Sequence, residues 1–195
     1  SSANTVAENA TLGTVVGITA QATYADGTQS AVTYTLDDDA GGRFAIDRAT
    51  GVVTVTGSLD YEAAAAHTLV VRASSADGSS TTQDFRVSVT DLDEFDVSAV
   101  TDINSSANTV AENATVGTVV GITAQATDAD ATQSAVAYTL DDDAGGRFAI
   151  DRSTGVVTVT GSLDYEAQAA HTLVVRATSA DGSSATQEFK VSVTD

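Results

Sequence analysis

The sequence contains no cysteine, no proline, no methionine and no tryptophan among its 195 residues. Without cysteine the chain has no disulfide, no thiolate metal ligand and no cysteine nucleophile. Small domains that have no disulfides need another stiffening element, and a bound metal ion is the obvious one. Without proline, a linker between domains has no access to polyproline stiffness. These absences direct attention to the charged residues.

Positive charge is also scarce, because 8 Lys and Arg stand against 27 Asp and Glu, for a formal net charge of -19. This excludes nucleic-acid binding, since phosphate contacts need Lys and Arg. Anionic membrane surfaces are disfavoured for the same reason, and no apolar run is long enough for membrane insertion. Cations are the partners that such a charge favours.

The chain is an internal repeat. Ser1–Asp91 aligns without gaps with Ser105–Asp195, at a spacing of 104 residues and with ten differences. Most differences are mild, but Tyr24 stands where the second copy has Asp128. A repeat of this length fits a whole β-domain better than a helical solenoid unit. The sequence therefore predicts module 1 at residues 1–91, an acidic linker at 92–104 and module 2 at 105–195, in a chain expected to belong to a longer array.

Each module contains short segments rich in Val and Thr that are bounded by Gly, Asp and Ser, a pattern typical of strands. Phe85, Val87 and Val89 alternate with polar residues, which indicates one buried and one wet face. The prediction is an all-β fold of two tandem Greek-key β-sandwiches of the immunoglobulin-like class. The segment 59–67 is expected to form at most a single helical turn. In module 1 the predicted strands cover residues 5–9, 14–23, 31–36, 43–47, 51–56, 67–74 and 82–90.

Acidic residues recur where the predicted strands end, and the strand ends of a sandwich converge at its two poles. So many carboxylates cannot converge in the ionised form without a cation between them. Oxygen ligands in excess, without Cys or His nearby, select calcium. The spacing is not that of an EF-hand. The candidate ligands are Glu8, Asp60 and Glu62 in module 1, Asp91, Asp93 and Glu94 in the linker, Asp128 and Asp130 at the near pole of module 2, and Glu112, Asp164 and Glu166 at its far pole.

Four short motifs, in this order, resemble those of the cadherin repeat: AEN at 7–9, DYE at 60–62, DLDEF at 91–95 and DAD at 128–130. Tyr61 replaces an Arg that the family favours, and Asp93 and Glu94 stand where it favours Asn and Asp. For a late x-Asp-x motif, Ser179 occupies the expected position and Asp181 lies two residues further on. The resemblance implies that these residues bind several calcium ions at the junction between modules and stiffen the array.

A closer resemblance is carried by TLDDDAGGRFAID at 35–47 and TGVVTVTGSLDYE at 50–62. Both are similar to bacterial cadherin-like repeats of giant surface adhesins, and the repeat as a whole is similar to the extender repeats of an ice-binding RTX-type adhesin. This implies a monomeric, calcium-rigidified spacer at a bacterial cell surface, outside the cell, which projects an adhesive tip. Its partners would be calcium ions and neighbouring repeats.

Other interpretations are weaker but distinct. A homophilic or carbohydrate-binding adhesion module would need an exposed aromatic or apolar patch, and aromatic residues are few. We expect no enzyme, because no nucleophile–base set or catalytic carboxylate pair stands out. His67 and His171 are expected to be structural. Asp102 and Asn104 fit either a calcium site or a plain turn, and the acidic runs 37–39 and 141–143 favour a turn.

Overall fold

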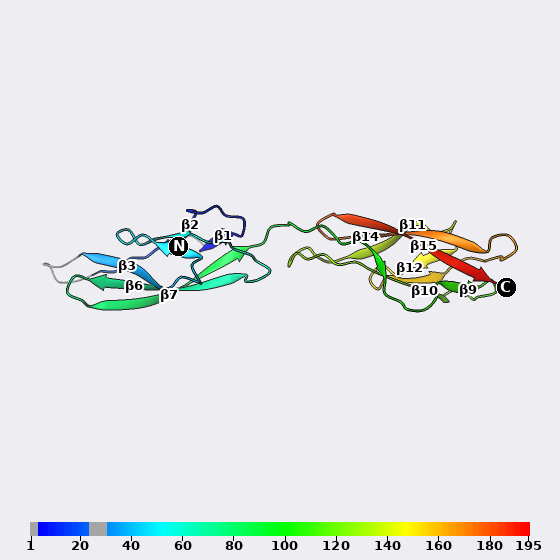
Figure 1. Cartoon of the computed structure of the whole chain (residues 1–195), viewed down its shortest axis with the longest axis horizontal. Helices are drawn as coiled ribbons and strands as arrows, with labels where there is room; N and C mark the ends of the chain where they lie inside the picture. Colours follow the sequence, from blue (N-terminus) through cyan, green and yellow to red (C-terminus); the bar gives the residue numbers. More distant parts are fainter. Residues whose placement is uncertain (1–3, 24–30) are drawn as a thin grey trace. The chain divides into compact units, whose positions relative to one another are not determined.

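The computed structural model describes residues 4–23 and 31–195, and Tyr24 lies outside them (Figure 1). The chain divides into two compact units, Ser1–Leu92 (unit 1) and Asp93–Asp195 (unit 2). Every regular element in the described residues is a strand. These residues contain no helix that is long and apolar enough to span a membrane. The predicted all-β class with two tandem sandwiches is confirmed.

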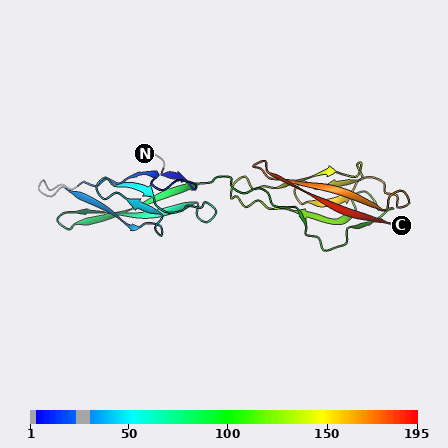
Figure 2. The same ribbon diagram turned by 45° about the horizontal axis from the view of Figure 1, so that its top comes forward.

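Unit 1 is built from two sheets (Figure 2). One has the order β1-β7-β6-β3 and the other the order β2-β5-β4. The pairing of β1 with β7 is parallel and the other pairings are antiparallel. Each strand predicted for module 1 has its counterpart here. The strands are β1 (Thr5–Ala7), β2 (Val15–Thr19), β3 (Val32–Asp38), β4 (Phe44–Ile46), β5 (Val52–Val55), β6 (Ala66–Ser75) and β7 (Ser80–Thr90).

Unit 2 repeats this plan with one addition. Its sheets have the orders β9-β15-β14-β11 and β8-β10-β13-β12. The additional strand, β8, pairs with β10 and has no counterpart among the described residues of unit 1. The strands are β8 (Thr101–Asp102), β9 (Thr109–Ala111), β10 (Val119–Gln125), β11 (Ala137–Asp142), β12 (Phe148–Ile150), β13 (Val156–Val159), β14 (Ala170–Thr178) and β15 (Ser184–Thr194).

The core of each unit lies between its two sheets and follows the period-two pattern of the sequence. In β7, Val87 and Val89 are buried and Phe85 packs against them at the edge of the core, as predicted. Leu69 and Val53 complete the centre of unit 1 and are fully buried. Burying one such side chain contributes about 1.5–3 kcal/mol, so the two cores are the main source of stability.

The segment 59–67 connects β5 to β6 and forms a turn rather than a helix. The N–H of Ala64 donates to the carbonyl of Asp60 at 3.0 Å, and the N–H of Ala63 donates to Asp60 Oδ1 at 2.8 Å. One hydrogen-bonded turn is what the sequence analysis allowed here. The turn holds Asp60 and Glu62 at the end of the sandwich where β1 and β7 finish.

All of the predicted linker except Leu92 is part of unit 2. Val97 and Val100 are buried there and pack with Tyr138, Val175 and Ala177. The residues that follow them form β8. The sequence pattern of 92–104 is dominated by its acids, and it did not reveal that two valines within it belong to a core.

Gly155 occupies a position that other residues cannot adopt without strain. Its φ is +70°, and a Cβ built there would lie 2.1 Å from the carbonyl oxygen of Ala124. Gly146 has a similar φ of +80°, but a Cβ there would meet no atom within 4 Å. The two positions therefore separate backbone strain from steric overlap.

We predict that Gly155→Ala destabilises unit 2 more than Gly146→Ala does. Backbone strain of this kind costs about 1–3 kcal/mol, and only the Gly155 variant adds the overlap with Ala124. Urea unfolding of the full chain in EDTA measures both values. Equal losses of unfolding free energy would contradict the close approach of β10 to this turn.

Each core contains one histidine in contact with a phenylalanine. The ring centroids of His171 and Phe148 are 5.6 Å apart with an interplanar angle of 63°, and His67 and Phe44 repeat the contact at 5.7 Å. Burial lowers the pKa of His171 and of His67, and the nearby Arg147 or Arg43 lowers it further. Their low pKa favours the neutral form of both rings, of which His171 is buried and His67 is half-buried beside the core.

We predict that both units lose stability as the pH falls below the ordinary histidine pKa of about 6.5. The pKa is lower in the folded state, so the unfolded chain takes up protons first and is favoured by acid. Melting temperatures between pH 7.5 and 5.5 in EDTA, compared with those of a His67→Phe/His171→Phe variant, measure this effect. If the melting temperature changes with pH by the same amount in both proteins, groups other than the histidines cause the pH dependence.

Candidate metal centre

Acidic side chains gather at three places in the described residues. We call them the Glu8 cluster (Glu8, Glu62 and Asp91), the Asp93 cluster (Asp93, Asp130 and Asp181) and the Glu112 cluster (Glu112, Asp164 and Glu166). Within each cluster, one carboxylate oxygen per residue lies within 4.8 Å of the others. Oxygens that share one calcium ion at about 2.3–2.6 Å are at most about 5 Å apart. The spacing within each cluster therefore suits a calcium ion.

The Glu8 cluster lies at the C-terminal ends of β1 and β7, where the chain passes out of unit 1. Glu8 is only 7% exposed, and its two carboxylate oxygens accept the N–H groups of Tyr61 and Leu92, each at 2.7 Å. These bonds tie the turn after β5 to the segment after β7. Glu62 from the turn and Asp91 from the end of β7 complete the cluster. The hydrogen bonds hold Glu8 in place for the other two carboxylates.

The Glu112 cluster is the repeat-related group in unit 2. Glu112 Oε2 accepts the N–H of Tyr165 at 2.8 Å, as Glu8 does with Tyr61. Glu112 is less buried than Glu8. Asp164 belongs to this cluster, whereas its counterpart Asp60 is not among the residues grouped with Glu8. The assignment of Asp60 as a calcium ligand therefore remains a prediction.

The Asp93 cluster joins the start of unit 2 to two of its loops. Asp130 is only 4% exposed and accepts the N–H of Glu94 at 3.2 Å and that of Phe95 at 3.1 Å. These bonds fold the segment after Asp93 against the loop that follows β10. Asp181 comes from the turn between β14 and β15, where its Oδ1 accepts the N–H of Ser183 at 2.6 Å.

For the late x-Asp-x motif, the sequence offers Ser179 at the expected position and Asp181 two residues further on. The structure gives these two residues different roles. Asp181 supplies the carboxylate of the cluster. The Ser179 hydroxyl donates to Asp128 and is buried. Asp128 also accepts the N–H of Asp130 at 3.1 Å. Asp181 is thus the residue that the structure brings into the cluster, and Asp128 lies beside it in the loop, where its role as a ligand remains a prediction.

Charge repulsion is visible at Asp93. Burial raises the pKa of its carboxyl, and the negative charges of Asp181, Asp130, Asp128 and Asp96 raise it further. In contrast, the pKa of Asp128 is lowered, chiefly by the hydrogen bond from Ser179. A cation placed among these carboxylates would remove the repulsion, because an opposite charge within a few ångströms favours the ionised form.

Asp102 and Asn104 have roles in turns. Asp102 Oδ1 accepts the N–H groups of Thr123 and Asn104, each at 3.0 Å, and Asn104 Oδ1 accepts the N–H of Ser106 at 2.9 Å. The described residues bring neither of them into an acidic cluster. Of the two interpretations that the sequence left open, these contacts favour the turn.

The acidic runs at the ends of β3 and β11, residues 37–39 and 141–143, also have local partners. Asp37 forms an ion pair with Arg72, which lowers the pKa of Asp37. Asp38 and Asp39 accept N–H groups of the following turn, from Ala40 at 2.9 Å and from Gly42 at 2.8 Å. The copy in unit 2 repeats these contacts. The last two residues of each run form the turn that the sequence favoured, whereas Asp37 and Asp141 pair with arginines of the neighbouring strands.

The model of the cadherin domain matches residues 3–90 and 107–194. This chain belongs to the cadherin family. Each match coincides with one of the two units, and cadherin domains in general bind calcium, the ion that the acidic clusters suit.

Its relatives are much longer cadherins. Human Protocadherin Fat 4 is 38% identical over 137 residues, which is 70% of this chain and 3% of that protein. Cadherin-7 of Gallus gallus is 34% identical over 157 residues, which is 73% of this chain and 20% of that protein. The chain thus spans a small fraction of the cadherins that it resembles.

Solved cadherin structures share its fold. Mouse Cadherin-23 EC22-24 superimposes with a TM-score of 0.76 at 28% identity, over 99% of this chain and 63% of that one. The extracellular domain of Protocadherin GammaB4 gives the same TM-score at 24% identity, over 98% of this chain and 30% of that one. The second likeness concerns the fold alone.

We predict that Glu8→Gln destabilises unit 1 more than Glu112→Gln destabilises unit 2. An amide keeps one acceptor oxygen, and Glu8 serves two N–H donors while Glu112 serves one in the described structure. One buried donor left unsatisfied costs about 1–3 kcal/mol. Urea unfolding in EDTA measures both variants without a contribution from metal. If the two losses are equal, the bond to Leu92 does not matter for stability.

Proposed function

We propose that this chain is a pair of calcium-bridged spacer modules within a long extracellular adhesion protein. The observation that carries the proposal is the placement of acidic clusters at the first and last strands of the cadherin domains. Calcium takes 6–8 oxygen ligands, so a site for one ion is assembled from several segments. Residues at the ends of a domain are suited to such sharing with a neighbouring repeat.

The sequence around the boundary supports a shared calcium site. Asp91 belongs to the Glu8 cluster and Asp93 to the Asp93 cluster. They are two residues apart, a backbone length of at most about 7 Å. Carboxylates from the two clusters are thus connected covalently at short range. We infer that calcium ions held here, with Glu94 and Asp128 as further ligands, tie each unit to the next.

The physical effect of calcium would be to stiffen the joint. Residues 91–96, which precede the buried Val97, contain no proline and carry four carboxylates. Without a metal ion this segment therefore lacks polyproline stiffness, and its charges repel one another. A divalent ion replaces this repulsion with attraction to oxygens from both units. A series of such joints makes a rod whose rigidity depends on calcium.

The surrounding protein is a further part of the proposal. The cadherins that this chain resembles are several times longer than the chain, which suits a pair of modules from a longer protein. The similarity of residues 35–62 to bacterial surface adhesins leads us to propose a bacterial cell surface, with the chain as a monomeric extender. Neither unit is proposed to be an enzyme.

An alternative role as an adhesive module is favoured by one observation. Leu12 and Val116 occupy the same position of the repeat and are 71% and 72% exposed. Val15 and Val119, three residues further on, are also about half exposed. Exposed apolar side chains that recur in this way suit self-association. A spacer stays monomeric in calcium at all protein concentrations, whereas an adhesive module associates as the concentration rises.

We predict that calcium raises the melting temperature and that EDTA reverses the effect. Binding to the folded state alone contributes about 2.7 kcal/mol when free calcium is 100 times its dissociation constant. Magnesium at the same concentration should stabilise less, because it requires a smaller and more regular site. An unchanged melting temperature in calcium would refute the proposal.

Asp93→Asn and Glu166→Gln compare the boundary with the far end of unit 2. A site with fewer carboxylates binds calcium more weakly, because the charge of the ligands tunes affinity. Titration calorimetry should therefore show tighter sites that Asp93→Asn weakens, and a weaker site that Glu166→Gln removes. Equal affinities at the two places would mean that the ligands have been assigned wrongly.

A further inference from the structure

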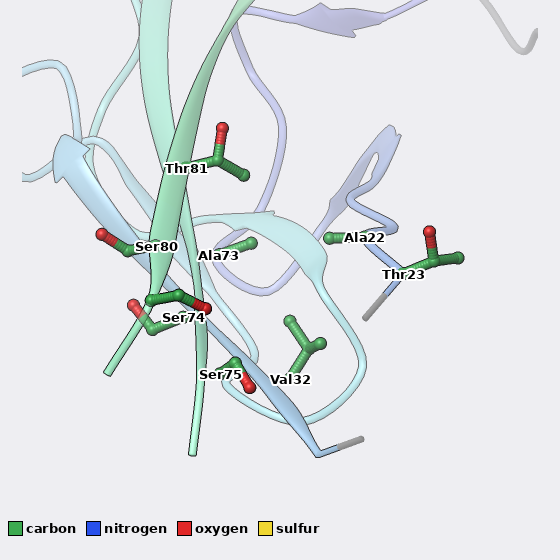
Figure 3. A pocket seen from close by; sticks show the side chains of 9 residues that line it. Ala22, Thr23, Val32, Ala73, Ser74, Ser75, Ser80 and Thr81 are labelled. Atoms are coloured by element: carbon green, nitrogen blue, oxygen red, sulfur yellow. The ribbon is translucent and has the colours of Figure 1, made fainter. Parts of the chain in front are cut away.

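The turn between the last two strands has the same sequence in both units. The hexapeptide SADGSS occupies residues 75–80 and 179–184. It connects β6 to β7 in unit 1 and β14 to β15 in unit 2. In Figure 3, Ser75 and Ser80 mark the two strand ends that the turn of unit 1 joins. Each turn contains aspartate followed by glycine, a pair that rearranges readily because glycine has no Cβ to shield its nitrogen.

The turn of unit 2 holds the two reacting groups of this rearrangement close together. Asp181 Oδ1 accepts the N–H of Ser183 at 2.6 Å. A hydrogen bond from the residue two positions further on folds the carboxyl group back over the peptide bond between Asp181 and Gly182. Gly182 has a φ of +104°, and a Cβ built there would meet no atom within 4 Å. The nitrogen of Gly182 therefore lies near the carboxyl carbon of Asp181, with open space beside it.

The reaction loses a water molecule and then regains it. The nitrogen of Gly182 attacks the side-chain carboxyl carbon of Asp181, and its proton leaves with the carboxyl hydroxyl as water, which gives a cyclic imide. Water then adds to the main-chain carbonyl of the imide, the bond from that carbon to nitrogen breaks, and the nitrogen stays joined to the former side chain. The product is isoaspartate. The reaction needs no oxidant, reductant or cofactor.

The fold regulates this reaction through the hydrogen bonds of the turn. The N–H of Gly182 donates to the carbonyl of Ser179 at 3.1 Å, and this bond must open before the nitrogen can attack. On the other side of the turn, Ser183 Oγ accepts the N–H of Val97 at 2.9 Å. The rate of the reaction in the folded chain therefore depends on local opening of the turn.

Asp181 is also a member of the Asp93 cluster, together with Asp93 and Asp130. Isoaspartate lengthens the main chain by one carbon and shortens the arm that carries the carboxylate. The carboxylate of residue 181 then leaves the position in which its oxygen lies within 4.8 Å of the oxygens of the other two residues. Because the number and charge of the ligands tune calcium affinity, the altered cluster should bind calcium more weakly.

We propose that Asp181–Gly182 is a site of spontaneous isomerisation to isoaspartate, that calcium at the Asp93 cluster suppresses the reaction, and that the product disables the cluster. Calcium acts through geometry, because a carboxylate held by the ion does not turn towards the nitrogen of Gly182. The effect of calcium rests on the proposed function, whereas the reactivity of the metal-free turn does not. A chain kept without calcium thus loses this site progressively.

Unit 1 supplies an internal control. Asp77 Oδ1 accepts the N–H of Ser79 at 2.9 Å, and Gly78 has a φ of +90°, so the turn has the same local geometry. Among the described residues, Asp77 belongs to none of the three acidic clusters. The Asp77–Gly78 peptide should therefore isomerise at a rate that calcium does not change.

The test incubates the full chain at neutral pH, below its melting temperature, in EDTA and in calcium. Trypsin cleaves after Lys and Arg and releases the two turns on separate peptides, residues 73–86 and 177–190. Mass spectrometry with electron-transfer fragmentation measures isoaspartate in each peptide. We expect isoaspartate in both peptides in EDTA. Free calcium at about ten times its dissociation constant should slow its formation in 177–190 about tenfold, because only ion-free molecules react, and should leave 73–86 unchanged.

Two variants separate the steps. Asp93→Asn should remove the protection by calcium and leave the rate in EDTA as it is in the parent chain. Asp181→Glu should give no isomer in 177–190, because the longer side chain would have to close a larger ring. Calorimetry on the aged parent chain should show calcium sites lost in proportion to isoaspartate in 177–190. Treatment with protein L-isoaspartate methyltransferase and S-adenosylmethionine should restore them.

Three results would overturn the proposal. In the first, residues 177–190 stay unmodified in EDTA while the same peptide free in solution isomerises, which would mean that the fold blocks the reaction. In the second, calcium slows both turns equally, which would assign its effect to the stability of the whole chain. In the third, the aged chain binds calcium as the fresh chain does. A chain that binds no calcium at all contradicts the proposed function, and isoaspartate formed in EDTA would still identify the reactive turn.

Discussion

Repulsion between carboxylates that the fold holds at its strand ends is the constraint around which this molecule is organised. Some of these groups are satisfied locally, as Glu8 is by two backbone N–H donors. Others are not compensated in this way, and the pKa of Asp93 is raised by burial and by its acidic neighbours. Arg72 and Arg176 do not relieve this, because they pair with Asp37 and Asp141 elsewhere on the sheets. A cation is therefore the natural complement of the chain.

Much of this was predictable from the sequence because the information is local. Alternation along residues 82–90 defines a half-buried strand whatever its neighbours are, and Val87 and Val89 are buried as expected. The sequence indicates candidate ligands because acidic residues recur where the predicted strands end, and their role as ligands remains a prediction. Asp130 and Asp181 meet Asp93 although they lie far from it in the sequence.

Other features depend on tertiary contacts that no local pattern contains. Val97 and Val100 lie in a segment whose acids dominate its composition, so their burial follows only from the groove that receives them. Asp60 and Asp164 have identical neighbours in sequence, yet only Asp164 belongs to a described cluster. The two units are nearly the same sequence in different surroundings. The differences between them identify what a neighbouring segment adds.

The parallel pairing of β1 with β7 has a mechanical consequence. β1 is the first described strand of unit 1 and β7 is the last, and their register Thr5–Ser88, Val6–Val89 and Ala7–Thr90 runs in one direction. Tension between the two ends pulls the strands past each other, so their hydrogen bonds are loaded together and not opened one at a time. β9 and β15 repeat the arrangement in unit 2. A tether made of such units resists extension through the geometry of its terminal strands, with a lifetime under load set by the rate of unfolding.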